Sequence, residues 1–236
     1  MTTRRIGLLA PMQPELKPLV KKLSLQRRTE GDTKLYDGTV GEVGVVATMT
    51  GIGMGPAKKA TERLLDSAGV EHVVVVGIAG GIDPALHIGD LVVPEVVIDG
   101  RTEHEYRPAP LGDHTPKGTI WSSDDFHTEP EVLDRLRGRG VVALDMETGA
   151  VAEVCQQRAV PWSVFRSISD RSEDGIVDEA IFAITSPSGG ANLKALAKYL
   201  LPKPWRVRKL ARLAKDMNVA TDAASDAAIE AFREPA

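Results

Sequence analysis

Short apolar runs alternate with amphipathic segments along the chain, an order typical of an α/β protein. Ile6 to Ala10, His72 to Ile78 and Trp162 to Ile168 are predominantly apolar and have the length of buried strands. The run that begins at His72 is rich in β-branched residues, which favours a central strand covered on both faces. Further strands are expected at Lys34–Val40, Val43–Met49 and Val141–Leu144.

Helical spacing follows several of these runs. Apolar residues share one face of Leu16–Leu23, behind Pro14, a residue suited to the first turn of a helix. Apolar positions also recur at helical spacing through Glu147–Arg158. A glycine-rich turn at Thr50–Ala57 precedes a helix that runs to about Ser67 and could bring backbone N–H groups close to a ligand oxygen.

The chain from Ala191 onward is predicted to be helical. An apolar helix is expected at Ala191–Leu201, and an apolar helical stripe runs from Trp205 to Met217 with basic residues around it. Asp222–Phe232 is then an alanine-rich final helix. We therefore expect a catalytic domain at residues 1–201 and a helical C-terminal extension at residues 202–236 that packs on it.

Composition is typical of a soluble globular protein. The chain has 236 residues, 42% hydrophobic and 26% charged, which is enough for one large α/β domain. Its net charge of -4 gives no electrostatic case for nucleic acid binding, and its single cysteine excludes an internal disulfide. The run Val73–Ile78 is far shorter than a membrane span, and the apolar run after Arg5 stops at Pro11, short of an export signal. We therefore expect a cytoplasmic protein.

Acidic residues follow two of the predicted strands. Asp145 and Glu147 come after the strand Val141–Leu144, and Asp170 comes after the strand that ends at Ile168. In an open α/β sheet, ligands bind at the strand ends. For any one of these acids alone, a helix cap or a favourable charge in a first helical turn is the simpler explanation.

Together, the two acidic motifs resemble the nucleoside phosphorylase/nucleosidase superfamily and, within it, the 5'-methylthioadenosine/S-adenosylhomocysteine nucleosidases. Those enzymes carry an acidic-Met-Glu motif, a helix that ends near a cysteine, and a strand that closes in Arg-x-Ile-Ser-Asp. Here these elements stand as Asp145-Met146-Glu147, as Cys155, and as the stretch from Arg166 to Asp170. The resemblance extends upstream to Ile6 and implies three layers, with a central twisted mixed sheet between helices, as in purine and uridine phosphorylases.

The resemblance also implies roles in breaking an N-ribosidic bond. Asp170 would be the acid at N7 of the leaving purine, and Glu15 would activate the attacking water. Glu147 would accept hydrogen bonds from the ribose hydroxyls, while Met146 packs against the sugar and Arg166 orients the carboxylates. These roles answer the two demands of the reaction, charge on the departing purine and an oxocarbenium-like ribose.

The base side of the expected site lies near residue 126. In the resembled family a Phe packs against the purine and the backbone of the next residue reads the base edge, which corresponds to Phe126 and His127. The alternative is a buried Phe126 beside aspartates that cap a helix at Glu129–Arg137. The remaining expected substrate-binding residues are Met12, Gly53 and Ser169.

Two positions in the sequence help to distinguish a hydrolase from a phosphorylase. Phosphorolysis needs a phosphate site with cations and hydroxyls, and related phosphorylases place an Arg and a Ser or Thr where this chain has Val75 and Ile78. We therefore expect a nucleosidase acting on a 5'-modified adenosine, methylthioadenosine or adenosylhomocysteine, although nucleosidases usually keep the Ser that Ile78 replaces. The alternatives are a phosphorylase with an unrecognised phosphate site, a relative that acts on another substituted adenosine such as adenosylhopane, and a non-catalytic nucleoside-binding protein.

Few partners are expected besides the nucleoside. The five histidines lack the spacing of metal ligands, so we expect no metal and no cofactor. Arg101–Pro116 is expected to be an exposed loop over the site, too short to close it, so that the second subunit of a homodimer closes the 5' side. A monomer closed by its own C-terminal helices is the alternative. The basic C-terminal segment could dock on an anionic membrane surface, but packing on its own domain is favoured.

Overall fold

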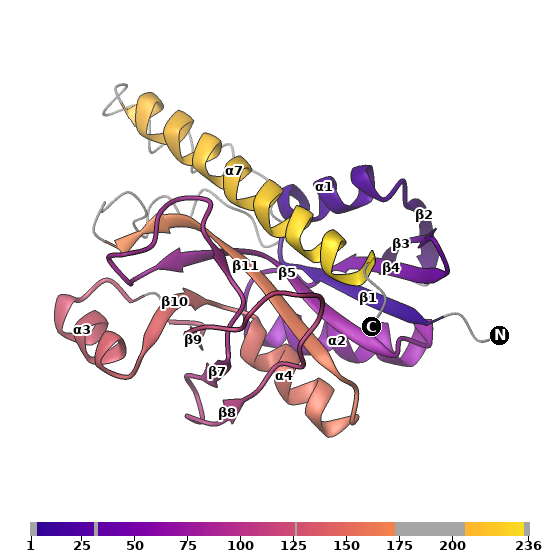
Figure 1. Cartoon of the computed structure of the whole chain (residues 1–236), viewed down its shortest axis with the longest axis horizontal. Helices are drawn as coiled ribbons and strands as arrows, with labels where there is room; N and C mark the ends of the chain where they lie inside the picture. The colour runs from indigo at the N-terminus through magenta and orange to yellow at the C-terminus, as the bar shows by residue number, and fades with distance from the viewer. Residues whose placement is uncertain (1–3, 31–32, 126, 173–205, 234–236) are drawn as a thin grey trace.

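The computed structural model describes residues 4–30, 33–125, 127–172 and 206–233. These residues form one mixed sheet with helices on both faces (Figure 1). The strands run in the order β2-β3-β4-β1-β5-β10-β9-β7-β8, and β11 pairs with β5 and β6. Their bounds are β1 Arg5–Ala10, β2 Gln26–Glu30, β3 Thr33–Val40, β4 Val43–Met49, β5 His72–Gly81, β6 Leu91–Val92, β7 Val96–Asp99, β8 Glu105–Tyr106, β9 Thr119–Ser122, β10 Val141–Asp145 and β11 Trp162–Arg171. The predicted helix at Ala191–Leu201 and the predicted boundary after residue 201 lie outside the described residues, so the division into two parts stays a prediction.

Strand β5 is the centre of the sheet. It pairs in parallel with β1 and β11, and β10 joins its carboxyl end at Gly80–Gly81 in the antiparallel sense. Val73 and Val75 belong to the apolar core on one face, while Val74 and Val76 belong to the core on the other. The prediction of a central strand covered on both faces is therefore confirmed.

Helices form the two outer layers, and this arrangement confirms the expected fold class. α2 (Met54–Ala68) and α4 (Thr148–Gln157) pack together on one face, α1 (Gln13–Lys22) and α7 (Arg206–Arg233) pack on the other, and α3 (Pro130–Gly138) packs beside β10. Leu64 of α2 and Val151 of α4 share one apolar core. Leu16 and Leu19 of α1 share the second core with the alanine-rich part of α7.

The C-terminal segment is one helix rather than the two that the apolar pattern predicted. Small residues, among them Ala220, Ala224 and Ala228, are fully buried at a spacing of four, which lets α7 lie close to β5, β11 and α1. In the N-terminal half of α7, up to residue 219, the described side chains are exposed or half-buried. Lys22 of α1 forms ion pairs with α7, from its Nζ to Asp222 Oδ1 at 3.1 Å and to Asp226 Oδ1 at 2.9 Å. No described helix has both the length and the apolar content needed to cross a membrane.

The carboxyl ends of four strands meet at one place. β1, β5 and β11 run parallel, so Pro11, Ile78 and Asp170 come to the same edge of the sheet. β10 approaches the same point from the other side, because Leu144 pairs with Gly80 in the antiparallel sense. Asp170 itself lies inside β11 rather than after it, since a register shift between Ile168 and Asp170 lets the pairing with β5 continue.

The loop at Arg101–Pro116 does not lie over this edge. It contains β8 and the buried Leu111. Arg101 and His104 line a separate depression of about 610 Å³ beside Glu153 of α4. The expectation that this loop covers the site is therefore wrong.

Candidate active site

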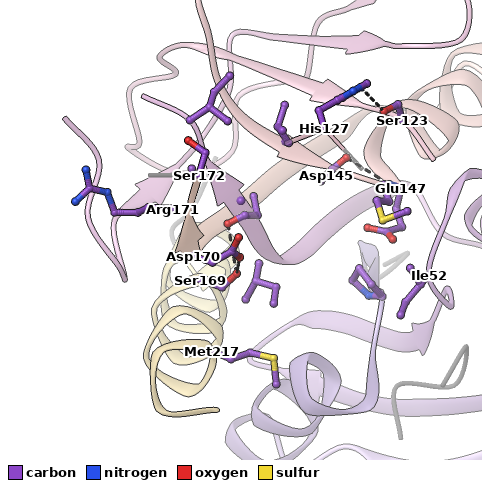
Figure 2. A pocket seen from close by; sticks show the side chains of 18 of the residues that line it. Ile52, Ser123, His127, Asp145, Glu147, Ser169, Asp170, Arg171, Ser172 and Met217 are labelled. Atoms are coloured by element: carbon purple, nitrogen blue, oxygen red, sulfur yellow. Dashed lines mark hydrogen bonds between the residues drawn. The ribbon is translucent and has the colours of Figure 1, made fainter. Parts of the chain in front are cut away.

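A cavity of about 350 Å³ opens where the strand ends meet, a volume within the range of small-molecule sites. Acidic and hydroxyl side chains gather on part of its wall, and Figure 2 shows them reaching inward from different strands and turns. Ile52, Ile78, Leu213 and Met217 supply apolar wall, the last two from α7 of the same chain. Such a cavity has room for a nucleoside-sized ligand with a polar and an apolar part.

Glu15 is fixed by the backbone on both sides of its carboxylate. It sits in the first turn of α1, is 1% exposed, and accepts hydrogen bonds from the Met12 N–H and the Ile78 N–H, both at 2.9 Å. The contact with Ile78 uses only the backbone, so the apolar side chain at this position leaves it intact. Glu15 therefore caps its own helix and still presents its carboxyl group to the cavity.

Arg166 lies behind the acidic wall and is fully buried. Its Nε and Nη2 lie 2.9 and 2.7 Å from Asp145 Oδ2, and Nη2 donates to Glu147 Oε2 and Thr148 Oγ1 at 3.1 Å. Its Nη1 lies 3.8 Å from Glu15 Oε1 and has no hydrogen-bond partner among the described residues. One guanidinium thus joins three carboxylates that come from α1, β10 and the turn after β10.

Glu147 is held from two directions. Its Oε1 accepts from the Gly53 N–H at 3.0 Å, just before α2, and its Oε2 accepts from Arg166. The positive φ of Gly53, 99°, belongs to the left-handed region that favours glycine. Glu147 is 5% exposed and lines the cavity.

Burial changes the proton affinity of both glutamates. Loss of solvent raises the pKa of Glu15 from 4.5 to about 8, against the attraction of Arg166. Burial likewise raises the pKa of Glu147 to about 7, against Arg166 and with the nearby charge of Asp145. Both carboxyl groups are therefore able to exchange a proton near neutral pH.

Asp170 lies across the cavity from Glu147 (Figure 2). The hydroxyl of Ser169 donates to Asp170 Oδ1 at 2.6 Å and orients the carboxyl group. Gly80 leaves room beside it, because a Cβ there would lie 3.4 Å from Asp170 Oδ2. The site thus presents two separate acidic positions, one at Glu15 and Glu147 and one at Asp170.

Most of the predicted site residues come together here. Those that line the cavity are Met12, Glu15, His127, Met146, Glu147, Ser169 and Asp170. Arg166 lies behind the carboxylates, and Gly53 touches Glu147 without lining the cavity. Phe126 lies outside the described residues, so its role stays a prediction.

Other contributors were missed or misplaced by sequence reasoning. Asp145 has a second task beyond a helix cap, since it also binds Arg166. Asp124 accepts from the Met54 N–H at 2.7 Å, so it caps α2 rather than the helix after it, α3. Leu213 and Met217 were predicted only as an apolar stripe, because nothing in a helical pattern shows what the stripe faces.

The fold and the site define an α/β protein with a carboxylate-rich cavity at its strand ends. Residues 5–116 and 109–202 match the family model described as Phosphorylase superfamily. The chain therefore belongs to the phosphorylase superfamily, which confirms the kinship that its motifs indicated.

Similar proteins are found among both sequences and solved structures. The chain is 28% identical to a 5'-methylthioadenosine/S-adenosylhomocysteine nucleosidase of Tolumonas auensis over 83% of this chain and 100% of the relative. It is 29% identical to the enzyme of that name from Halalkalibacterium halodurans, over 80% and 95%. Its fold matches the Helicobacter pylori nucleosidase of the same name, with a TM-score of 0.75, 18% identity and 100% of both chains covered. A futalosine hydrolase of Helicobacter pylori matches with a TM-score of 0.72, 18% identity and 99% of both chains covered.

Gly77→Ala is expected to lower the free energy of unfolding by ~1–3 kcal/mol, the cost typical of overpacking. A Cβ at this position would overlap the Glu15 carboxylate and lie 2.7 Å from Arg166 Nη1. Denaturant titration measures the effect. Gly55→Ala is the matched control, because its Cβ would meet nothing within 4 Å. Equal stability of Gly77→Ala and the wild type would contradict the packing of Glu15 and Arg166 over Gly77.

Glu15→Gln is expected to flatten the dependence of stability on pH. The folded pKa of Glu15 is about 8 against an ordinary 4.5, so the folded state retains a proton that the unfolded state loses. This contribution to stability is fully present below about 4.5 and is lost as pH rises towards 8. Unfolding free energies at several pH values in this window, compared with those of exposed Glu71→Gln, test it. Identical slopes for wild type and Glu15→Gln would refute the raised pKa.

Proposed function

We propose that this protein is a purine nucleosidase that hydrolyses the N-glycosidic bond of a 5'-modified adenosine, releasing adenine and the ribose product. The observation that carries the proposal is the convergence of Glu15, Glu147 and Asp170 on one cavity. The names of the relatives support methylthioadenosine or adenosylhomocysteine as the substrate. The futalosine hydrolase among the structural neighbours supports, as the second candidate, a relative acting on a different 5'-substituted adenosine, such as adenosylhopane.

Asp170 is assigned to the leaving purine. When the bond between C1' and N9 breaks, its electron pair leaves with the base, and a proton delivered to N7 neutralises the charge. Asp170 is suited to this task because it lines the cavity and its Oδ2 lies beside Gly80, which has no side chain. Its other oxygen is held by Ser169.

Glu15 is assigned to the attacking water. The water oxygen bonds to C1' and gives a proton to the carboxylate, which must be ionised to accept it. A pKa of about 8 is close to the operating pH, where a general base combines a useful ionised fraction with strong proton affinity. Arg166, 3.8 Å away, favours the ionised form.

Glu147 and Met146 are assigned to the ribose. Glu147 has one oxygen on Gly53 and one on Arg166, and a carboxylate oxygen can accept more than one hydrogen bond. It can therefore accept from ribose hydroxyls without leaving its place. Met146 lines the cavity beside it and can pack against the sugar.

A phosphorylase is the rival enzyme, and the residues around β5 disfavour it. Val75 is buried in the core and Ile78 offers an apolar side chain to the cavity, where related phosphorylases would supply a cation and a hydroxyl. Among the described lining residues, Arg171 is the one lysine or arginine, and it also donates to the Pro84 carbonyl. These residues offer a phosphate dianion little charge-assisted binding.

A homodimer and a cytoplasmic role in methionine salvage are inferred from the resembled nucleosidases. Leu213 and Met217 give the cavity a wall from its own chain, which supports a monomer as the alternative. Docking of the basic part of α7 on a membrane remains the disfavoured alternative. Light scattering across a dilution series would separate monomer from dimer.

A panel of 5'-substituted adenosines, scored for free adenine with and without phosphate, tests the function. Adenine release from at least one member of the panel in phosphate-free buffer is expected, because the site can activate water. Strict dependence on phosphate would overturn hydrolysis in favour of phosphorolysis. No release from any member under either condition would favour a protein that binds nucleosides without reacting.

Asp170→Asn is expected to reduce turnover by at least ~10²-fold, because an amide cannot give a proton to the purine. Steady-state kinetics measure the loss, and thermal unfolding checks that the variant folds. Asp90→Asn is a matched control, since Asp90 accepts a backbone hydrogen bond from His87 outside the cavity. Near-normal turnover in Asp170→Asn would remove Asp170 from the role of acid.

A further inference from the structure

Asp145, the first acid of the Asp-Met-Glu motif, makes more contacts with Arg166 and the start of α4 than a helix cap requires. Asp145 is 8% exposed and stands at the end of β10. Its Oδ1 accepts from the backbone N–H groups of Glu147 and Thr148 at 3.3 and 3.2 Å. Its Oδ2 accepts from Arg166 and from the Thr148 hydroxyl. Each oxygen thus serves a different part of the site.

We propose that Asp145 is a positioning residue for the reaction, which fixes the orientation of Arg166 and Glu147 at the substrate site. The proposal rests on the proposed nucleosidase function. It assigns to Asp145 no contact with the reacting atoms, since it acts through its two neighbours.

Distances identify Asp145 as the main anchor of the arginine. Its Oδ2 lies 2.9 Å from Arg166 Nε and 2.7 Å from Nη2, whereas Glu147 is at 3.1 Å and Glu15 at 3.8 Å. A guanidinium gripped along its Nε–Nη2 edge has little freedom to rotate. Nη1 is consequently left next to Glu15 without a hydrogen-bond partner among the described residues.

The same residue fixes the backbone from which Glu147 projects. The bonds from the Glu147 and Thr148 N–H groups to Oδ1 set the start of α4. The Thr148 hydroxyl closes the unit, because it donates to Asp145 and accepts from Arg166 Nη2. β10, α4 and β11 therefore meet through this one carboxylate.

Asp145 also adds a charge that Glu147 senses. The charged groups that face Glu147 are Arg166 from β11, Asp145 from β10 and Glu15 from α1. Arg166 lowers the pKa of Glu147 and Asp145 raises it. Removal of the charge on Asp145 is therefore expected to lower the pKa of Glu147, a change that the loss of a helix cap alone would not produce.

Asp145→Asn tests the proposal. It is expected to lower kcat/KM by about 10- to 100-fold, the loss typical when a residue that orients a functional group through a hydrogen bond is removed, as measured in metal sites. The acidic limb of its pH profile is expected to move to lower pH. Asp145→Glu keeps the charge and is expected to recover most of the activity. Thr148→Val keeps the charge and loses the hydroxyl, so its acidic limb is expected to stay in place.

Asp99→Asn is the matched control. Asp99 is another buried aspartate, 1% exposed and 2.6 Å from Arg101, but it lies outside the cavity. This variant is expected to lose stability while its kinetic constants and pH profile stay as in the wild type. A pH profile that shifts equally in Asp99→Asn and Asp145→Asn would overturn the proposal.

A carbon-13 NMR titration of the glutamate carboxyl groups separates this proposal from the proposed function. It follows Glu147 with no substrate present, so it remains informative if the wild type releases no adenine. A lower pKa of Glu147 in Asp145→Asn is expected. An unchanged titration, together with wild-type kinetics in Asp145→Asn, would reduce Asp145 to a helix cap. If Asp145→Asn does not fold, Thr148→Val carries the test. It is expected to lower kcat/KM, because it loses the hydroxyl that joins Asp145 to Arg166. Wild-type kinetics in Thr148→Val would then overturn the proposal.

Discussion

The site depends on one buried guanidinium. Arg166 is fully enclosed, and a buried charge of this kind is tolerated only when partners replace the water it has lost. Asp145 and Glu147 supply direct bonds, and Glu15 lies within ionic range. Loss of one partner from such a group typically costs about 3–5 kcal/mol, because the remaining charge is left uncompensated. The acids of the site therefore contribute to the fold as well as to its chemistry.

Burial around this arginine gives the two glutamates their proton affinity. Loss of solvent disfavours the charged forms of Glu15 and Glu147 and is the largest cause of their raised pKa values. The attraction of Arg166 opposes this effect, and repulsion by a neighbouring carboxylate adds to it. The balance leaves both groups with a pKa near 7 or 8.

Sequence reasoning captured the parts of the fold that are written in local patterns. Runs such as His72–Ile78 predicted the strands, while the layers and a shared site for Glu147 and Asp170 were implied by the family resemblance of the Asp-Met-Glu motif. Long-range contacts carry no such pattern. The hydrogen bond from the Met54 N–H to Asp124 spans 70 residues, and the choice between capping α2 and capping α3 is made only in three dimensions.

Two further differences have physical causes. Ile78 lacks the hydroxyl that nucleosidases usually have at this position, but its backbone N–H, which every residue except proline supplies, donates to Glu15. The loop at Arg101–Pro116 was assigned to the site because it is polar. It packs instead against α4, where Arg101 pairs with Asp99 and Glu153. Polarity identifies an exposed segment without saying which part of the molecule it borders.

The two halves of α7 have separate tasks, and this has an evolutionary consequence. Alanines anchor its C-terminal half in the core, while Leu213 and Met217 in its N-terminal half line the cavity. Neither of these two residues contacts Arg166 or its carboxylate partners in the hydrogen bonds and ion pairs described above. Substitutions there can reshape the cavity while the carboxylates keep their geometry and their proton affinity. Proteins with this fold can therefore change their ligand preference through substitutions in one helix, while the carboxylates of the site stay the same.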